Sequence, residues 1–152
     1  MAQITVWRIV DPKYAADAFS GIGAEILGGR FNSKGRRLVY TAGSVSLALL
    51  ELLVQANKRS RLREYLCIPA TFDASQVEVH DADLPNGWDA RPYTHVSQHF
   101  GDRWLEEERS LVLRVPSVVV PQEYNYLINP AHPEMGTVEI GDAFPAPFDD
   151  RL

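Results

Sequence analysis

Hydrophobic and polar positions alternate in several short segments, and each such segment predicts a β-strand. The first is ITVWRIV, residues 4–10, which is rich in β-branched side chains and interrupted only by Arg8. The same pattern predicts strands at 38–40, 66–72 and 76–79, in SLVLRVPSVVV (110–120) up to a break at Pro116, and in YNYLINP (124–130). The final segment, GDAFPAPFDDRL, is expected to be an extended arm packed by Phe144 and Phe148.

Helical periodicity is strongest in SVSLALLELLVQANKRSR, which predicts a helix from about Ser44 to Arg59. Ser44 or Ser46 can cap its start, and Lys58 and Arg59 suit the negative end of the helix dipole. A short helix is expected near 13–19, followed by a glycine-punctuated loop. Another helix is expected over about 94–107, after a polar loop at 81–93.

These strands and helices are mixed without a regular βαβ alternation, so the sequence predicts an α+β fold with a mainly antiparallel sheet. The chain has 152 residues, with no internal repeat and no linker that would divide it. We therefore expect a single domain over residues 1–152.

Composition narrows the function classes. A net charge of −5 argues against a protein that coats nucleic acid, although it leaves room for a local basic patch. The single cysteine, Cys67, excludes an internal disulfide and a multi-thiolate metal site, and it favours a reducing compartment. We see no signal-peptide pattern and no apolar run near the roughly 18–20 residues that span a bilayer. A cytoplasmic protein without membrane attachment is expected.

The segment GGRFNSKGRRLVYTA, residues 28–42, concentrates chemistry of one kind. Gly28, Gly29 and Gly35 allow close backbone approach to a ligand, and Arg30 can grip a phosphate through paired hydrogen bonds. The spacing is neither that of a Walker A loop nor GxGxxG. Two interpretations stay open at this point: a solvated basic turn, or one wall of a pocket for an anion.

Glu51 is a single charge among leucines in LALLELLVQ. Helical spacing puts it on a stripe with Ser44, Ala48, Gln55 and Lys58, the polar face of an otherwise apolar helix. That position suits a solvent-facing glutamate. It also suits a ligand-facing carboxylate, because Ser44 and Ala48 are small. Periodicity does not decide between the two.

Other polar residues carry weaker signals. His95 and His99 have the i,i+4 spacing of a metal pair, but no glutamate or third ligand accompanies them, so we expect structural histidines there and at His132, and no metal. Ser117, at the strand break, and Ser110 are candidate hydroxyls, although neither lies in a G-x-S-x-G elbow. KRSRLR, residues 58–63, is typical of a solvated basic helix end.

In combination, GGRFNSKGRRLVYTA, SLALLE and LVLRVPSVVVPQEYNYLINPAHP resemble the RES domain family, in order and from WRI near residue 7 to the terminal PFDDRL. The resemblance covers nearly the whole chain; Phe31 departs from it where a tryptophan is more usual. It implies the toxin of a bacterial toxin–antitoxin pair that causes growth arrest, with a split sheet like that of ADP-ribosyltransferase toxins.

The family's activity implies that NAD+ is a substrate, cleaved at its nicotinamide–ribose bond by hydrolysis or phosphorolysis, with no separate cofactor. The alternatives are ADP-ribose transfer to a protein and a non-enzymatic nucleotide-binding module. The implied partner is an Xre-family DNA-binding antitoxin that blocks the active site. No direct nucleic-acid contact by this chain is implied, and a homodimer within a larger toxin–antitoxin assembly is compatible with the family.

The family's site residues carry over by position. Its arginine falls on Arg30, its tyrosine on Tyr40, its glutamate on Glu51, and its serine on Ser117, with Ser110 as the competing choice. The resemblance thus implies catalytic roles for the first four and contact with NAD+ for Arg30, Tyr40 and Glu51, with Asn32 and Ser110 as further candidates. The serine is expected to hydrogen-bond the nicotinamide amide or the ribose. Asn129–His132 also belong to the pattern, without a catalytic role.

Overall fold

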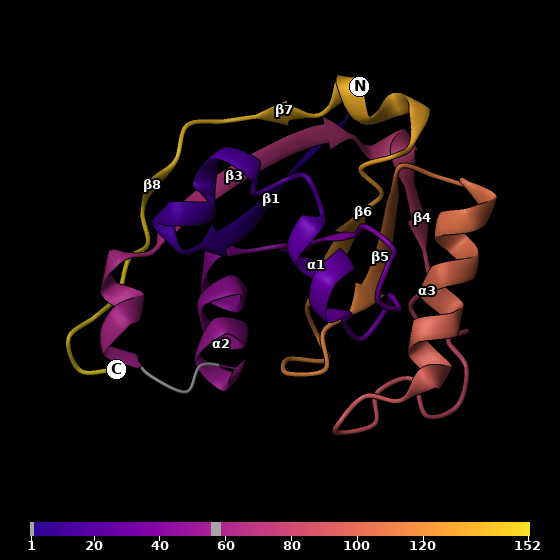
Figure 1. Ribbon diagram of the computed structural model, residues 1–152, viewed down its shortest axis with the longest axis horizontal. Helices are drawn as coiled ribbons and strands as arrows, with labels where there is room; N and C mark the ends of the chain where they lie inside the picture. Colours follow the sequence, from indigo (N-terminus) through magenta and orange to yellow (C-terminus); the bar gives the residue numbers. More distant parts are fainter. Residues whose placement is uncertain (1, 56–58) are drawn as a thin grey trace.

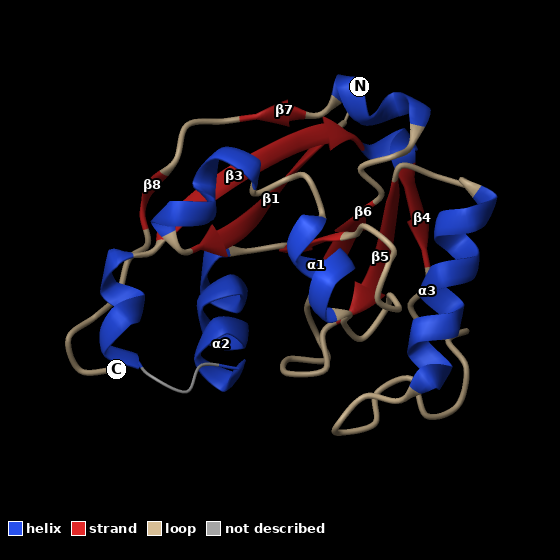
Figure 2. Ribbon diagram, viewed as in Figure 1, coloured by secondary structure: helices blue, strands red, loops and turns tan. Residues whose placement is uncertain are grey.

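The strands form one mixed sheet in the computed structural model, which describes residues 2–55 and 59–152. The strands are β1 (Gln3–Val10), β2 (Val39–Ala42), β3 (Leu66–Asp73), β4 (Val77–Val79), β5 (Val112–Pro116), β6 (Tyr124–Ile128), β7 (Glu139–Ile140) and β8 (Phe144–Pro145). Their order is β4-β5-β6-β2-β1-β3-β7, with β8 also paired to β3 (Figures 1 and 2). The pairings are antiparallel except for β4 with β5, which confirms a mainly antiparallel α+β fold.

The sheet is nearly divided in its middle. β1 pairs with β3 along its whole length, from Gln3 opposite Asp73 to Val10 opposite Leu66. In contrast, β1 pairs with β2 only where Trp7 faces Ala42. Beyond that pair the two strands separate, so the sheet has two wings, β4-β5-β6-β2 and β1-β3-β7, joined at one point. The candidate site described below lies in this opening between β1 and β2.

Within residues 2–55 and 59–152, three α-helices lie beside the sheet, at separate places along it (Figure 1). They are α1 (Ile22–Leu27), α2 (Val45–Gln55) and α3 (His95–Glu107); the 3-10 helices are η1 (Pro12–Asp17), η2 (Arg59–Glu64), η3 (Ala74–Gln76) and η4 (Pro133–Thr137). Side chains cap the starts of the two longer α-helices. Leu47 N donates to Ser44 Oγ (3.1 Å), one of the two caps expected for α2, and Val96 N donates to Thr94 Oγ1 (3.3 Å) at the start of α3. In the described part of the chain, none of the helices is long and apolar enough to cross a membrane.

Alternation along the strands separates the core into layers. Leu113, Val115 and Leu127 pack with Trp104 of α3 on one face of the sheet, whereas Val112 and Ile128 face the other core. A smaller cluster joins α2 to the sheet: Leu47 and Ala48 of α2 and Ala42 of β2 pack against Trp7, Ile9 and Val120. α2 is therefore anchored to β1 and β2 next to the opening.

Several sequence-based boundaries need correction. The segment after residue 19 is not only a loop, because residues 22–27 form α1; the helix expected at 13–19 is the 3-10 helix η1. The long helix expected to reach Arg59 ends as α2 at Gln55, and Lys58 lies outside the described residues. The terminal arm, 141–152, is extended, as expected, and adds β8 to β3, with Phe144 edge-on to Trp7; β7, just before the arm, also pairs with β3.

Candidate active site

A cleft of about 860 Å³ lies where β1 and β2 separate. Its walls come from β1, β2 and α2, from the glycine loop at 28–31, and from the loop at 91–93. Arg30, Tyr40 and Glu51, which sequence reasoning singled out separately, all line it. Among the residues that the structure describes, three arginines and one glutamate are its charged lining residues, so the cleft is positive in an acidic protein. Such a cleft favours an anionic ligand.

The glycine loop is held in a fixed shape, in contrast to a solvated turn. Gly29 and Asn32 form a bridge, and the fully buried Asn32 donates through Nδ2 to the carbonyl oxygens of Ala24 (2.8 Å), Ser33 (3.2 Å) and Arg36 (3.0 Å). Asn32 does not line the cleft. Its place is beneath the loop, where it fixes the backbone that carries Arg30.

Helix α3 supports the same loop from behind. Asp102 accepts hydrogen bonds from Ser33 N (2.9 Å) and Ser33 Oγ (2.5 Å), and Gln98 Nε2 donates to Gly29 O (3.1 Å). Gly101 leaves room for the loop, since a Cβ there would lie 1.8 Å from the carbonyl oxygen of Phe31. The loop is therefore seated on the helix by both hydrogen bonds and close packing.

Arg30 is held by the loop that precedes α3. Its Nη1 donates to the carbonyl oxygens of Trp88 (2.9 Å) and Ala90 (2.8 Å), and its guanidinium lies 5.8 Å from the ring centre of Tyr93. Burial lowers the pKa of Arg30 while the nearby Asp89 raises it. One edge of the guanidinium is thus engaged with backbone carbonyls, which fixes the plane of the group beside the cleft.

The neighbouring arginines of the loop form ion pairs with carboxylates. Arg36 forms ion pairs with Asp102 (3.7 Å) and Glu106, and Arg37 with Glu25 (3.3 Å). These pairs lie outside the lining of the cleft. Arg30 is therefore the arginine of this segment that faces the ligand space.

Tyr40 is locked by its hydroxyl. The Oη atom donates to Asn32 Oδ1 (2.6 Å) and accepts from Phe31 N (3.0 Å). Burial raises its pKa above the ordinary value, so the phenol stays protonated. Gly29 permits this contact, because a Cβ at that position would lie 2.5 Å from the hydroxyl oxygen. The ring is left as a fixed aromatic surface lining the cleft.

Glu51 projects from α2 into the cleft and is half-buried. Its Oε1 accepts from Asn125 Nδ2 (2.8 Å), and its Oε2 accepts from Ser117 Oγ (3.0 Å). Burial raises the pKa of Glu51, whereas the hydrogen bonds from Asn125 and Ser117 favour the ionised form and lower it. Of the polar stripe of α2, Ala48, Glu51 and Gln55 therefore line the cleft.

The two candidate serines have different surroundings. Ser117 is fully buried; its Oγ accepts from the backbone N–H groups of Val119 and Val120 (3.1 Å each), and its proton goes to Glu51. Its hydroxyl is thus directed at the carboxylate and not at the cleft, where the sequence led us to expect a direct contact with the ligand. Ser110 Oγ accepts from Trp104 Nε1 (2.9 Å) and donates to Val112 O (2.9 Å), away from the cleft lining.

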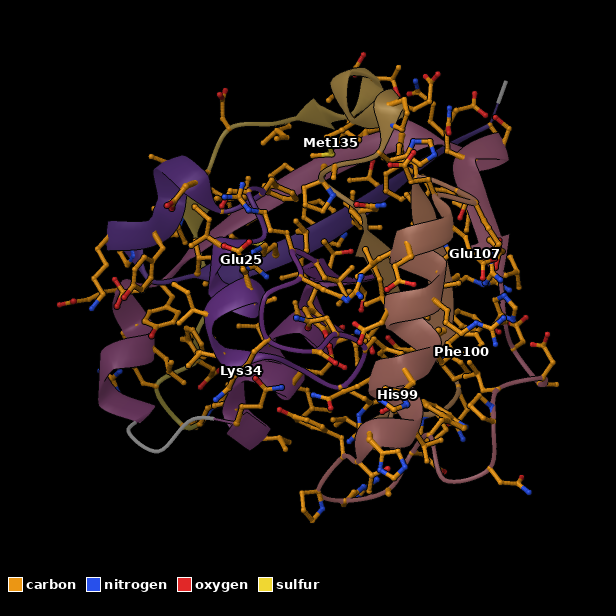
Figure 3. The ribbon with its side chains drawn as sticks, turned by 45° about the vertical axis from the view of Figure 1, so that its right-hand side comes forward. Glu25, Lys34, His99, Phe100, Glu107 and Met135 are labelled. Carbon is orange, nitrogen blue, oxygen red and sulfur yellow. The ribbon has the colours of Figure 1, made fainter. Side chains whose placement is uncertain are left out.

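His95, His99 and His132 occupy surface or capping positions. His95 and His99 are exposed on the first turns of α3, with ring centres 5.4 Å apart, and Figure 3 labels His99 there. Among the described residues no group of three potential ligands is placed to hold a metal ion. His132 Nδ1 accepts from Glu134 N (3.0 Å) at the start of η4, which is a structural role.

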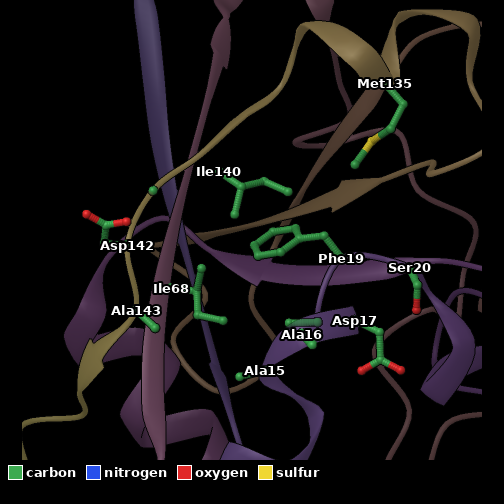
Figure 4. A pocket seen from close by; sticks show the side chains of 12 residues that line it. Ala15, Ala16, Asp17, Phe19, Ser20, Ile68, Met135, Ile140, Asp142 and Ala143 are labelled. Carbon is green, nitrogen blue, oxygen red and sulfur yellow. The ribbon is translucent and has the colours of Figure 1, made fainter.

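A second cavity, of about 500 Å³, lies on the β3–β7 side (Figure 4). Phe19, Ile68 and Ile140 give it an apolar lining, and its charged residues are the carboxylates Asp17 and Asp142. Acidic groups repel an anion, so the cleft between β1 and β2 is the better candidate for an anionic substrate.

Sequence reasoning missed several lining residues. Asn125 holds Glu51 and also donates to Thr41 O (3.2 Å), yet it reads as an ordinary polar position between two tyrosines. Arg91 and Tyr93 come from a loop without a motif. Arg8 also lines the cleft, and its position could have been used as a signal, because a charged residue inside an apolar strand is unusual and indicates a specific role.

Comparisons with known proteins agree with this fold. The RES domain family model matches residues 5–149. The chain is 46% identical over 134 residues to the Prs ADP-ribosylating toxin of Sphingobium sp. (strain YBL2), covering 84% of this chain and 83% of that protein. It is 41% identical over 140 residues to Toxin Res of Yersinia enterocolitica, covering 87% of this chain and 88% of that protein.

Among solved structures, a chain in the crystal structure of the M. tuberculosis MbcT–MbcA toxin–antitoxin complex has the same fold, with a TM-score of 0.77 at 16% identity. The match covers 95% of this chain and 84% of that one. The family model spans nearly the whole sequence, and the relatives match over most of their own length. The chain belongs to the RES domain family.

Proposed function

We propose that this protein is the toxin of a toxin–antitoxin pair and that it consumes NAD+ by breaking the nicotinamide–ribose bond. The observation that carries the proposal is the pairing, in one positive cleft, of a fixed guanidinium with a carboxylate held by two hydrogen bonds. The dinucleotide has an anionic pyrophosphate for the first group and a ribose that becomes cationic during cleavage for the second.

Binding would use the rigid parts of the cleft. Arg30 would hold the pyrophosphate or a neighbouring ribose oxygen with the N–H groups that Trp88 and Ala90 leave free. The ring of Tyr40 would stack on nicotinamide, with its orientation fixed through Asn32. Asn32 then supports binding from below the loop and does not touch the substrate.

Cleavage would depend on Glu51. When the bond from ribose C1′ to nicotinamide nitrogen breaks, its electron pair leaves with nicotinamide, and positive charge spreads over C1′ and the ring oxygen. A carboxylate in a partly buried site stabilises that charge, or holds the ribose hydroxyls, more strongly in the transition state than in the bound substrate. Nicotinamide is already a good leaving group, so a strong general acid is not required.

Ser117 and Asn125 would act through this carboxylate. Both donate to Glu51, so they fix its position and favour its charged form. We therefore assign the family's serine to Ser117 as a positioning residue and give Ser110 a structural role at Trp104.

The acceptor of the ADP-ribose decides between two activities. Water or phosphate would give NAD+ degradation, which we propose as the principal activity. Transfer to a protein is the second candidate, and the Sphingobium relative, named as an ADP-ribosylating toxin, favours it. Both share the cleavage step described above.

An enzyme that consumes NAD+ must be inhibited in its own host cell. We propose that an antitoxin of the Xre type does this by covering the cleft. The shared fold with a chain from a toxin–antitoxin complex supports an antitoxin partner. An acidic segment or a terminal carboxylate would complement the three arginines at the cleft.

Incubation of the partner-free protein with NAD+ labelled in its adenine half tests the proposal. Free labelled ADP-ribose, or its phosphate ester when phosphate is present, is expected. Label retained on protein after denaturation would shift the assignment to transfer. Intact NAD+ after long incubation would refute both NAD+ degradation and ADP-ribose transfer.

A further inference from the structure

The second cavity, of about 500 Å³, shares no lining residue with the cleft between β1 and β2. Its floor is apolar, since Phe19 and Ile68 both line it and are almost fully buried. Its walls come from η1, from η4, from β7 and from the segment that follows β7. A volume of this size falls in the range of ligand-binding pockets.

Small residues form two of the walls. Ala15 and Ala16 line the cavity from η1, and Gly141 and Ala143 line it from the other side. Gly141 lies directly against β3, because its N–H donates to Pro69 O (2.9 Å) and a Cβ there would lie 2.8 Å from Pro69 Cγ. Backbone contact with β3 therefore holds this wall in place, and the short side chains leave the apolar floor accessible.

The rim of the cavity carries a large apolar side chain and two carboxylates. Ile140 of β7 is 51% exposed. Asp17 and Asp142 are exposed as well, and Figure 4 shows the apolar floor between their carboxylates. Within residues 2–55 and 59–152, neither carboxylate has an ion-pair partner, and no lysine, arginine or histidine lines the cavity.

This chemistry selects one class of ligand. A phosphate-bearing ligand is repelled by the two carboxylates. A purely apolar ligand would cover the floor and take water away from both carboxylates without replacing it. Among the described residues, no group of three potential ligands is placed to hold a metal ion. A ligand with an apolar body and a cation at each end satisfies both the floor and the rim.

We propose that this cavity is a docking site for a basic segment of a partner protein. An apolar side chain of the segment enters the cavity, and a lysine or arginine on either side of it pairs with Asp17 and Asp142. Charge complementarity with the rim carries the choice of partner. The inference goes beyond the proposed function, because none of these residues lines the cleft, and the acidic segment proposed to cover the cleft has the opposite charge.

Short peptides that differ in one property at a time test the docking site. The first probe is acetyl-Arg-Leu-Arg-amide. Two further probes replace both arginines by glutamine or by glutamate, and acetyl-Arg-Gly-Arg-amide removes the apolar side chain. Binding to the full-length protein is followed by NMR of labelled isoleucine and methionine methyl groups. Ile68, Met135 and Ile140 report on the cavity. Ile26 of α1, outside it, is the internal control.

The Arg-Leu-Arg peptide should shift the three cavity signals and leave that of Ile26 in place. Its affinity should be roughly 2- to 30-fold higher than that of the glutamine peptide, because two exposed ion pairs each add a factor of about 1.4 to 5. The glutamate peptide should bind more weakly than the glutamine peptide. The glycine peptide should bind roughly 10- to 100-fold more weakly than Arg-Leu-Arg, because it buries no leucine side chain.

Protein variants should mirror the peptides. Asp17→Asn combined with Asp142→Asn should abolish the preference for arginine over glutamine. Ala16→Leu should abolish the preference for leucine over glycine, because the new side chain fills the cavity. Glu108→Gln, at an exposed carboxylate next to the end of α3 and outside the cavity, is the control and should bind all peptides like the parent. All of these variants should turn over NAD+ at the parent rate.

Three results would overturn the proposal. One is the absence of shifts at the cavity with every peptide, and another is equal affinity for the arginine and glutamate peptides. The third is a shift of the Ile68 and Ile140 signals with protein concentration alone, which would make this face a contact between two copies of the chain. A parent that does not turn over NAD+ refutes the proposed function, while the peptides still decide the docking site.

Discussion

Replacing Glu51 by glutamine separates the chemistry of the cleft from its architecture. The substitution keeps the size of the side chain and removes the charge that would face the developing ribose cation. Loss of one well-placed electrostatic partner costs about 2.7–4 kcal/mol of barrier. We therefore expect kcat/KM for NAD+ to fall by roughly 10²- to 10³-fold.

The effect of Glu51→Gln on stability should be small, because two changes oppose each other. The carboxylate accepts one hydrogen bond on each oxygen, from Asn125 and from Ser117. An amide has one acceptor oxygen, so one bond is lost, worth about 0.5–1.5 kcal/mol. Against this, the variant no longer holds a charge in a partly buried site.

The sign of the second change follows from the pKa. Burial raises the pKa of Glu51 in the folded protein above its ordinary value of 4.5, so the folded state binds more protons than the unfolded state in the window just above that value. The parent loses stability as the pH rises through this window, and the glutamine variant does not. At neutral pH the melting temperature of Glu51→Gln should stay within about 4 °C of the parent.

Release of nicotinamide from NAD+ is the assay, with melting followed in parallel. Glu139→Gln makes the same atomic change on an exposed residue of β7, outside the cleft, and should turn over NAD+ at the parent rate. A folded Glu51→Gln protein with the activity of the parent would show that the carboxylate does not stabilise the transition state.

Other substitutions test the supports of the site. Asn125→Leu removes a hydrogen bond that lowers the pKa of the site carboxylate, so the acid limb of the kcat/KM profile should move to higher pH. Ser117→Ala should lower turnover, whereas Ser110→Ala should lose about 1 kcal/mol of stability in a urea titration and keep its turnover. Gly29→Ala puts a Cβ against the Tyr40 hydroxyl and should reduce kcat/KM by roughly 10- to 100-fold.

Each of these predictions has an outcome that would contradict it. An acid limb that stays in place would separate Asn125 from the ionisation of Glu51. Equal turnover losses for the two serine variants would reject the assignment of Ser117. Gly136→Ala, in open space within η4, is the control for Gly29→Ala, and equal activity of these two variants would mean that the tyrosine does not need its position.

Much of the secondary structure followed from local patterns. The alternation in ITVWRIV located β1, and the helix expected over about 94–107 is α3, His95–Glu107. Helix α1 was missed because it is short and its N-cap residue is Gly21, which is in a left-handed conformation and has no side chain to cap the helix. Because isolated helices this short are marginal in water, α1 depends on tertiary packing, and no local sequence pattern separates it from a turn.

The site was accessible from sequence only in part. Periodicity put Glu51 on the polar face of α2, but whether that face meets solvent or a cleft depends on the separation of β1 from β2, which is a tertiary property. The parallel pairing of β4 with β5, around α3, was also not evident from a chain without repeated βαβ units. Asn125 came to Glu51 from 74 residues away, a distance that no local pattern spans.

A structure of the Glu51→Gln protein with NAD+ bound is the most direct test, because it asks whether residues 30 and 51 meet one dinucleotide. The account predicts a phosphate or ribose oxygen of NAD+ at the Arg30 guanidinium and the nicotinamide-bearing ribose beside residue 51, in the cleft between β1 and β2. NAD+ bound elsewhere, or bound with its nicotinamide end directed away from residue 51, would contradict it.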